Sequence, residues 1–508
     1  MNYPAPEKGA KDWNFESLKR IYHEIDVIAE KELALDLYPN QIEIITFEQM
    51  LDAYSSIGMP LMYQHWSFGK NFARDELLYR HGLRNLAYEI VINSNPCISY
   101  LMEENSMMMQ TLVIAHAAFG HNHFFKNNNL FKQWTDANGI LSYLEFAKGY
   151  IALCESRYGE AEVERILDAA HALMTQGVNR YPKRKTFNLA DEERKARERF
   201  EEQERSYNEL WKTVPSSSAK PANDPRNASA RRHLLGLPEE NILYFLEKKS
   251  PLLKPWEREI IRIVRQVAQY FYPQKQTKMM NEGCATFIHY YIMNRLHQTG
   301  RLSEGTMLEF LQSHTAAVFQ PDFDHPGYYG MNPYALGFGL MQDIKRVCKH
   351  PTEEDKAWNP DIAGCGDWLG ALKEAWANHR DESFIRQYLS PHLIRKMKFF
   401  DVYDDGKSDL LVKAIHNEHG YRTIRTNLAD QFDVIQNEPE IEIVDVDLNG
   451  DRKLLLQHRI HNGRLIDERD VKDVLRHLAN LWGYEVILSE VSAQTQATIK
   501  QYAVGPER

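Results

Sequence analysis

The sequence has no long apolar run, few cysteines and no excess of basic residues. No stretch approaches the roughly 18 apolar residues that a membrane-spanning helix needs. The N-terminal segment MNYPAPEKGAKDWNF contains no apolar core of a secretory signal. The five cysteines form no Cys-x-x-Cys pair, which is typical of reduced thiols rather than of disulfides or a cysteine-bound metal. We therefore expect a cytoplasmic protein without a membrane span.

The charge balance and the missing motifs narrow the function further. Lys and Arg number 61 against 71 Asp and Glu, a net charge of −10, which argues against a nucleic-acid-binding face. The sequence lacks GxGxxG and GxxxxGK[ST], the motifs of dinucleotide-binding and P-loop proteins. It also lacks GxSxG and HExxH, the motifs of α/β-hydrolases and of HExxH zinc enzymes. Hydrophobic residues make up 43% and charged residues 26%, which are ordinary globular values.

Periodicity predicts a mainly α protein with an α+β C-terminal domain. Apolar residues recur at helical spacing from 14 to 36, whereas LAYEIVIN (86–93) contains β-branched and aromatic residues typical of a strand and ends in the turn signal SNP. After residue 400, strands and helices follow in the order ββαββαβ, which predicts segregated layers. Helices are also expected at 98–119, 139–156 and 160–176, and again, with interruptions by loops, over 238–396.

Composition divides the chain into five expected parts. The segment 191–205 carries charges of both signs, typical of a solvated helix or a docking helix, and 214–232 is rich in Ser, Pro and Ala, typical of a flexible linker. The expected parts are a helical portion (1–185), the charged helix and linker (186–232), a second helical portion (233–398), the α+β domain (399–495) and a tail (496–508).

Two histidines mark the first candidate site. His116 and His121 end an apolar stretch and are five residues apart. On an ideal helix their directions differ by about 140°. They converge only if the helix changes pitch or ends between them, and Gly120 is well placed to end it.

A second candidate segment lies in MNEGCATFIH (280–289). Glu282 and His289 are seven residues apart and therefore share a helix face, with the small residues Ala285 and Thr286 between them. A carboxylate and an imidazole on one face can bind a divalent cation, and zinc is the default for mixed nitrogen and oxygen ligands. The alternative is a polar hydrogen-bond network without metal.

These segments resemble zincin metallohydrolases of the gluzincin kind. In that family an edge strand precedes a helix with two histidines, and a later helix supplies a glutamate, often within NEGxA. Here the corresponding elements are the strand at 86–93, the helix with His116 and His121, and NEGCA from Asn281. Two differences argue against peptidase activity: Ala117 stands where the family has its general-base glutamate, and the histidine spacing is five instead of four.

Longer segments resemble the SpoVR family, named for stage V sporulation protein R. They are YPNQIEIITFEQMLDAYSSIGMPLMYQHWSFGK, LAYEIVINSNPCISYLMEEN, AHAAFGHNHFFKNN, YFYPQKQTKMMNEGCATF, HTAAVFQP, NPYALGF and QYLSPHLI. The resemblance implies a cytoplasmic bacterial protein linked to spore cortex formation, or to stress and stationary-phase physiology in relatives that do not sporulate. It also implies a PrkA-like serine kinase and a von Willebrand-type protein as associated proteins, and it supplies no established reaction.

Other polar residues fit the same pocket. Glu89 lies in the strand before the histidine helix, and His314 could be a further ligand or a proton shuttle. Each of the remaining candidates has a structural explanation as well, such as packing or stabilisation of a helix end: they are His65, Glu103, Glu104, Tyr328, Tyr329 and Tyr334.

Two classes of function follow from these observations. In the first, His116, His121 and Glu282, with His289 as a further ligand, hold a divalent metal in a hydrolase whose substrate is a peptide or a cell-wall amide. In the second, the zincin-like helical body is non-catalytic and regulates a serine kinase through the α+β domain or the charged helix. The missing HExxH favours the second class, and the gathering of potential ligands favours the first.

Overall fold

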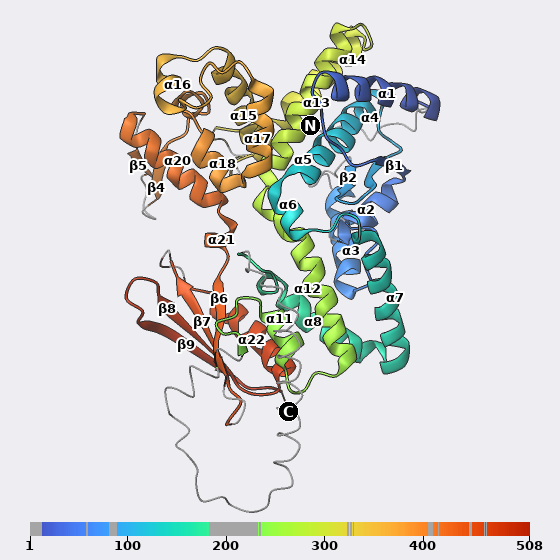
Figure 1. Ribbon diagram of the computed structural model, residues 1–508. Coiled ribbons are helices and arrows are strands. Elements are labelled where there is room, and N and C mark those ends of the chain that lie inside the picture. Colours follow the sequence, from blue (N-terminus) through green and yellow to red (C-terminus); the bar gives the residue numbers. More distant parts are fainter. Residues whose placement is uncertain are drawn as a thin grey trace, which may run out of the picture. The chain divides into compact units, whose positions relative to one another are not determined.

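The computed structural model describes most of the chain, as two compact units (Figure 1). The first unit comprises Met1–Asp168 and Gln266–Glu438, and the second comprises Ala169–Arg265 and Pro439–Arg508. The charged segment 191–205 and nearly all of the expected linker lie outside the described residues. Those described are 13–56, 59–80, 89–181, 232, 235–322, 325, 328, 330–404, 410–414, 416–446, 450–461, 463 and 465–507.

The fold is mostly helical with a small C-terminal sheet, as the sequence predicts. Across the described ranges no helix is both long and apolar enough to cross a membrane.

A three-stranded sheet lies in the first unit. Its strands are β1 (Asn40–Ile45), β2 (Glu89–Ile92) and β3 (Cys97–Met102). They run in the order β1-β3-β2, with β1 parallel and β2 antiparallel to the central β3. The strand expected near 86–93 is β2. The helix expected at 98–119 is wrong in its first part, because the β-branched and aromatic residues of CISYLM pair on both sides and form β3.

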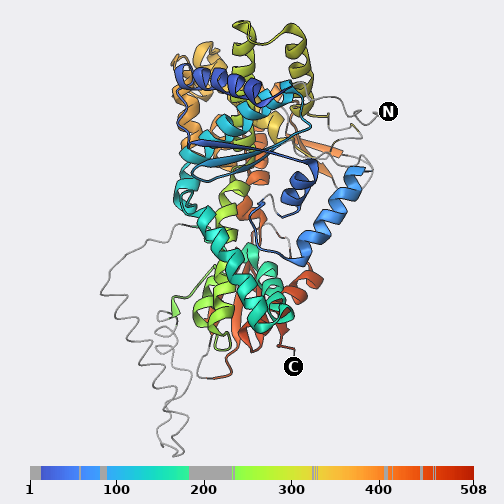
Figure 2. The same ribbon diagram turned by 90° about the vertical axis from the view of Figure 1, so that its right-hand side faces the viewer.

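The histidine segment forms one continuous helical rod beside this sheet. Ser106 caps α4 (Met107–Val113), which passes directly into the π-helix η1 (Ile114–His121) and then into α5 (Asn122–Asn127). In Figure 2 the blue strands lie beside this cyan rod. The rod does not end at Gly120. A Cβ atom at that position would meet the Cα of Ala285 at 2.5 Å, so the glycine instead permits a close approach of α13 (Lys278–Gln298).

Helix α13 is the central element of the first unit. It packs against η1, against α15 (Pro333–Lys349) and against α1 (Phe15–Lys31). A second glycine contact joins α13 to α15, since a Cβ on Gly283 would lie 2.6 Å from the backbone of Gly337. Apolar residues surround most of α13, which is typical of a core helix with neighbours on all sides.

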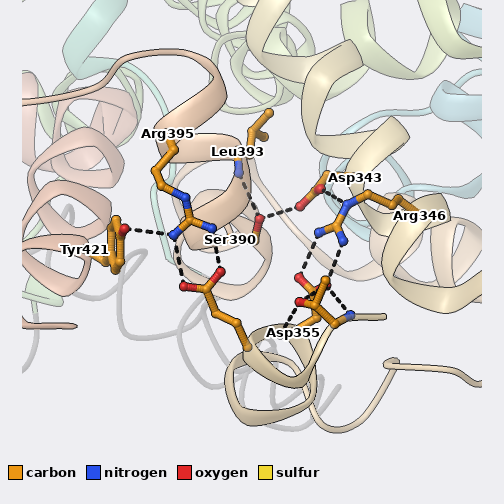
Figure 3. A network of polar contacts seen from close by, with 9 residues as sticks. Asp343, Arg346, Asp355, Ser390, Leu393, Arg395 and Tyr421 are labelled. Atoms are coloured by element: carbon orange, nitrogen blue, oxygen red, sulfur yellow. Dashed lines mark hydrogen bonds and ion pairs between the residues drawn. The ribbon is translucent and has the colours of Figure 1, made fainter. Parts of the chain in front are cut away.

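A buried ion-pair network fastens the C-terminal helices of the first unit (Figure 3). Arg346 on α15 donates from Nη1 and Nη2 to both carboxylate oxygens of Asp355, at 2.6 and 2.7 Å, and from Nε to Asp343 at 2.8 Å. Ser390, which caps α19 (Pro391–Lys396), donates to the other oxygen of Asp343. The network therefore joins α15 to α19 and to α16 (Glu353–Trp358).

The remaining elements of the first unit are mostly helices. The helices expected at 139–156 and 160–176 are α7 (Ile140–Tyr158) and α8 (Glu160–Ala172), and most of α8 belongs to this unit. A short 3₁₀ turn, η2 (Met174–Gln176), follows α8 in the second unit. The other elements of the first unit are α2 (Phe47–Ser55), α3 (Trp66–Arg80), α6 (Asn129–Trp134), α14 (Glu304–Ala317), α17 (Trp368–Asn378), α18 (Asp381–Tyr388), α20 (Glu418–Phe432), α21 (Val434–Asn437), and the hairpin of β4 (Asp401–Asp404) and β5 (Leu410–Ala414).

The second unit consists of a β-sheet and helices that pack against it. Strands β6 (Glu440–Val446), β7 (Leu454–Ile460), β8 (Val486–Ser492) and β9 (Thr498–Val504) form one sheet in chain order, with only β7 and β8 parallel. Helix α22 (Glu468–Trp482) buries Val471, Leu475 and Leu478 against it. Helix α11 (Ile242–Lys249) belongs to this unit, and α12 (Pro255–Gln276) contributes to both.

The C-terminal division differs from the expected one in two respects. The expected boundary is residue 399, yet β4, β5 and α20 belong to the first unit, because α20 packs on α18 and Arg425 donates to the carbonyl of Leu389. The strands of the expected ββαββαβ layer therefore fall into two separate sheets. Residues 498–504, expected in a tail, pair with β8 as strand β9.

Candidate functional site

Four side chains from three elements converge in the first unit. Glu89 comes from β2, His116 and His121 from η1, and Glu282 from α13, and we call these four residues the Glu/His cluster. The Nε2 atom of His116 lies 3.3 Å from Glu89 Oε1 and 3.6 Å from Glu282 Oε2. The corresponding distances from His121 Nε2 are 3.8 and 3.7 Å. Both imidazoles therefore face both carboxylates.

The π-helix brings the two histidines together. Its hydrogen bonds span five residues, so side chains five apart lie about one turn apart on the same side. The rings of His116 and His121 accordingly meet edge to face, with centroids 4.6 Å apart. Of the two ways in which the sequence allows convergence, the change of pitch is the one that occurs.

The far nitrogens of both rings are held by neighbours. Nδ1 of His121 donates to the amide oxygen of Asn281 at 2.9 Å, which leaves a lone pair on Nε2, the atom that faces the carboxylates. Nδ1 of His116 lies 2.9 Å from Nδ1 of His289, and Nε2 of His289 lies 3.2 Å from Nδ1 of His314. These contacts fix the ring orientations in the way that outer-sphere partners orient metal-binding histidines.

Burial sets the protonation of the cluster. It lowers the pKa of His121 to about 4, with His116 as the next cause, so this ring is neutral at neutral pH. It raises the pKa of Glu89 to about 7, against the opposing effect of His116. Burial by itself would raise the pKa of Glu282 too, but His116 and His121 outweigh it and the pKa is lowered. Glu282 is therefore negatively charged at neutral pH, in a half-buried position.

Each carboxylate keeps an oxygen without a hydrogen bond. Among the residues that the structure describes, no donor makes a hydrogen bond of 3.5 Å or less to Glu89 Oε2 or to Glu282 Oε2, and both atoms are shielded from solvent. A buried acceptor without a donor costs about 1–3 kcal/mol, and more when it is charged. Glu282 Oε2 and the other oxygen of Glu89, Oε1, face the lone pair on His121 Nε2, and a cation would satisfy this arrangement.

Comparison with known proteins identifies the family. The family described as "SpoVR like protein" matches residues 12–437, and the one described as "SpoVR-like C-terminal domain" matches residues 439–493. This chain belongs to the SpoVR family. It is 55% identical over 480 residues to the "Uncharacterized protein YcgB" of Escherichia coli (strain K12), covering 94% of this chain and 92% of YcgB. No solved structure matches the chain, so the zincin resemblance stays a prediction.

The boundary between the two SpoVR matches coincides with the last of the three chain positions at which one compact unit gives way to the other. The first ends at residue 437 and the second begins at 439, while the first unit ends at Glu438. All four members of the Glu/His cluster fall within the first match.

The structure brings together three of the four residues predicted to bind metal. His116, His121 and Glu282 share the cluster, whereas His289 contacts the side of His116 that faces away from the carboxylates. Sequence reasoning placed Glu89 in the pocket without giving it a ligand role. The available signal was a carboxylate within the apolar strand LAYEIVI, where an acidic side chain needs a partner.

The other polar candidates lie around the cluster or away from it. His314 extends the chain of imidazoles beyond His289, and the Tyr334 ring is stacked near His116 with centroids 6.4 Å apart. His65 instead contacts Asp168 at 3.1 Å. Glu103 and Glu104 lie in the turn between β3 and α4, and of the two remaining tyrosines Tyr328 is described whereas Tyr329 is outside the described residues.

Proposed function

We propose that this SpoVR-family protein binds one divalent metal ion, zinc by its donor set, through the Glu/His cluster. Two observations support this most: each imidazole Nε2 lies 3.3–3.8 Å from an oxygen of both carboxylates, and the ligand atoms of Glu89, His116 and His121 all lie within 4.8 Å of one another. Donors about 2.0–2.2 Å from a common zinc ion at the tetrahedral angle lie about 3.3–3.6 Å from each other. Two imidazoles and two carboxylates suit a borderline divalent cation.

The proposal makes Glu89 the fourth ligand in place of His289. Structural zinc sites are closed by four protein ligands, whereas catalytic sites keep a position for water. A metal held by Glu89, the two histidines and Glu282 would cross-link β2, η1 and α13, which are far apart in the sequence. The favoured function is thus a metal-stabilised SpoVR body rather than a hydrolase.

A metal-dependent hydrolase is the second candidate, and one observation favours it. Glu89 Oε1 lies 3.3 Å from His116 Nε2 and 3.8 Å from His121 Nε2, so it would be close to a water molecule on a metal that these histidines hold, as a general base must be. Ala117 occupies the position of the usual general base and cannot accept a proton, so Glu89 would have to act as the base instead of binding the metal. In that case His116, His121 and Glu282 alone would hold the ion.

Elemental analysis of the untagged full-length protein tests the metal site. We expect about one zinc per chain, and substantially less in His121→Ala and Glu282→Ala, because loss of one ligand weakens a four-ligand site severely. His297→Ala is the matched control: it lies on the same helix as Glu282 but pairs with the exposed Glu304. Wild-type protein grown with added zinc that carries no divalent metal would overturn the proposal.

Glu89→Gln separates the two candidates. An amide is a poor ligand for zinc but preserves the shape of the side chain, so we expect this variant to lose metal if Glu89 is the fourth ligand. Full retention of metal would instead assign the ion to three ligands and favour the hydrolase. The measurement is again metal per chain, with folding checked by circular dichroism.

The family supports a proposal about physiology as well. SpoVR is named for sporulation, and on that basis we propose a role in spore formation or stationary-phase stress, in partnership with a PrkA-like serine kinase. Affinity purification from stationary-phase cells should recover the kinase together with this protein. Recovery of a known control complex without the kinase would count against the partnership.

A further inference from the structure

A cavity separate from the Glu/His cluster opens along the C-terminal half of α13. Its volume is about 470 Å³, within the usual range for small-molecule sites. The residues that matter here are Glu32, Phe287, Tyr291, Arg295, Gln342 and Lys345, which come from the region of α1, from α13 and from α15. All of them belong to the first unit.

The charges of this cavity do not balance. Arg295 holds Glu32 with two hydrogen bonds, Nε to Oε2 at 2.7 Å and Nη2 to Oε1 at 2.9 Å, and the Tyr291 hydroxyl donates to the same carboxylate at 2.9 Å. That pair is neutral as a whole. Lys345 has no carboxylate within ion-pair distance in the described part of the chain, so the cavity keeps one positive charge.

Aromatic rings hold the Lys345 ammonium group in place. Its Nζ lies 4.5 Å from the ring centroid of Trp368, 5.5 Å from that of Tyr291 and 5.6 Å from that of Phe287. Such contacts stabilise a cation by about 0.5–2 kcal/mol but supply no hydrogen-bond acceptor for its three donors. Burial, and then Lys349, lowers the pKa of Lys345, as expected for an ammonium group that lacks an anion.

We propose that this cavity binds a small organic anion whose carboxylate or phosphate group is carried on a flat ring. The anionic group pairs with Lys345 and accepts from its free N–H donors, with the Gln342 amide beside it. The ring lies against Tyr290 and Tyr291, the two half-buried aromatic residues of the cavity lining. This inference does not depend on the metal site.

Titration of the full-length protein tests the proposal, with tryptophan fluorescence and calorimetry as readouts. The probes are benzoate, AMP and inorganic phosphate, and the variant is Lys345→Met, which keeps the length of the side chain and its contact with the rings. Lys349→Met is the matched control, because Lys349 is exposed and its Nζ lies 5.8 Å from the same tryptophan ring.

We expect benzoate or AMP to bind saturably to the wild type and to Lys349→Met, with affinity lowered about tenfold or more in Lys345→Met. Removal of metal by a chelator should leave this binding unchanged. The proposal is overturned if no probe saturates in the millimolar range, if Lys345→Met binds as tightly as the wild type, or if inorganic phosphate binds as tightly as the ring compounds.

Discussion

Gly120 sets the distance between the two helices that carry the Glu/His cluster. A Cβ at this position would approach Ala285 Cα to 2.5 Å and Ala285 Cβ to 2.7 Å, so η1 and α13 would have to separate. We expect Gly120→Ala to lower the free energy of unfolding by about 1–3 kcal/mol and to reduce the metal content, because Glu282 moves with α13.

The control for Gly120→Ala is Gly149→Ala. Gly149 lies in the interior of α7, and a Cβ there would meet no atom within 4 Å. Alanine is the better helix former, so this change should raise stability by about 0.5–1 kcal/mol. Equal effects of the two substitutions in chemical denaturation would contradict the close-packing account of Gly120.

Asp355 should make the first unit sensitive to acid. Burial alone would raise its pKa, but hydrogen bonds from Arg346 and Thr352 outweigh it and hold the pKa below its ordinary value of 3.8. A carboxylate whose pKa is lower in the folded chain stabilises the fold above the unfolded pKa, and this contribution is lost as the pH falls further. We expect Asp355→Asn to cost about 2 kcal/mol at pH 7 and progressively less below about pH 4.

Glu353→Gln provides the comparison for Asp355→Asn. Glu353 lies in the same short helix, but its partner Lys356 and its own side chain are largely exposed, at 53% and 90%. An exposed pair of this kind contributes about 0–0.5 kcal/mol. Urea denaturation at pH 7 and at pH 3 measures both variants, and a cost of Asp355→Asn that does not change with pH would contradict the argument.

At the scale of elements, the sequence predicted those helices and strands whose formation depends mainly on residues close to one another in the chain. Helices α1 and α7 and strand β2 lie close to where the sequence places them, although α1 ends at Lys31, because apolar spacing and β-branched composition are local signals. β3 was missed because CISYLM lies at the start of a longer apolar stretch, and its strand character comes from pairing with β1 and β2. The sequence placed Glu89 in the same pocket but gave it no ligand role, because its distance from the histidines depends on the tertiary packing of β2 beside η1.

Strand β9 should be necessary for the sheet of the second unit. It pairs with β8 along its length and buries Tyr502. A chain that ends at Gln496 leaves β8 as an unpaired edge, which invites aggregation. We expect its melting temperature to fall by about 5–10 °C, whereas a chain that ends at Gly505, which retains β9, should melt close to the wild type in a thermal scan with light scattering.

At the scale of the whole molecule, the Glu/His cluster lies entirely within one unit. Its four residues precede Asp168 or lie between Gln266 and Glu438. Damage to the core of the second unit should therefore leave the proposed metal site intact. Leu478→Ala, at a buried position of α22, should cost about 3 kcal/mol of stability, with the metal content per soluble chain unchanged.

Lys472→Ala is the control for this prediction. Lys472 lies on the same helix, its side chain is 53% exposed, and it pairs with Glu468 on the surface. It should change neither stability nor metal content appreciably. A parallel loss of metal and stability in Leu478→Ala would show that the cluster depends on the second unit.

The π-helix has a consequence for how metal sites are recognised in genomes. Zinc helices are usually sought as two histidines separated by three residues, which lie one turn apart on an α-helix. His116 and His121 are separated by four residues and reach the same relation on a π-helix. The two spacings differ by one inserted residue, and each brings two histidines to the same side of its own type of helix. Searches that accept both spacings would retrieve pairs of converging histidines such as His116 and His121, which a search with one fixed spacing discards.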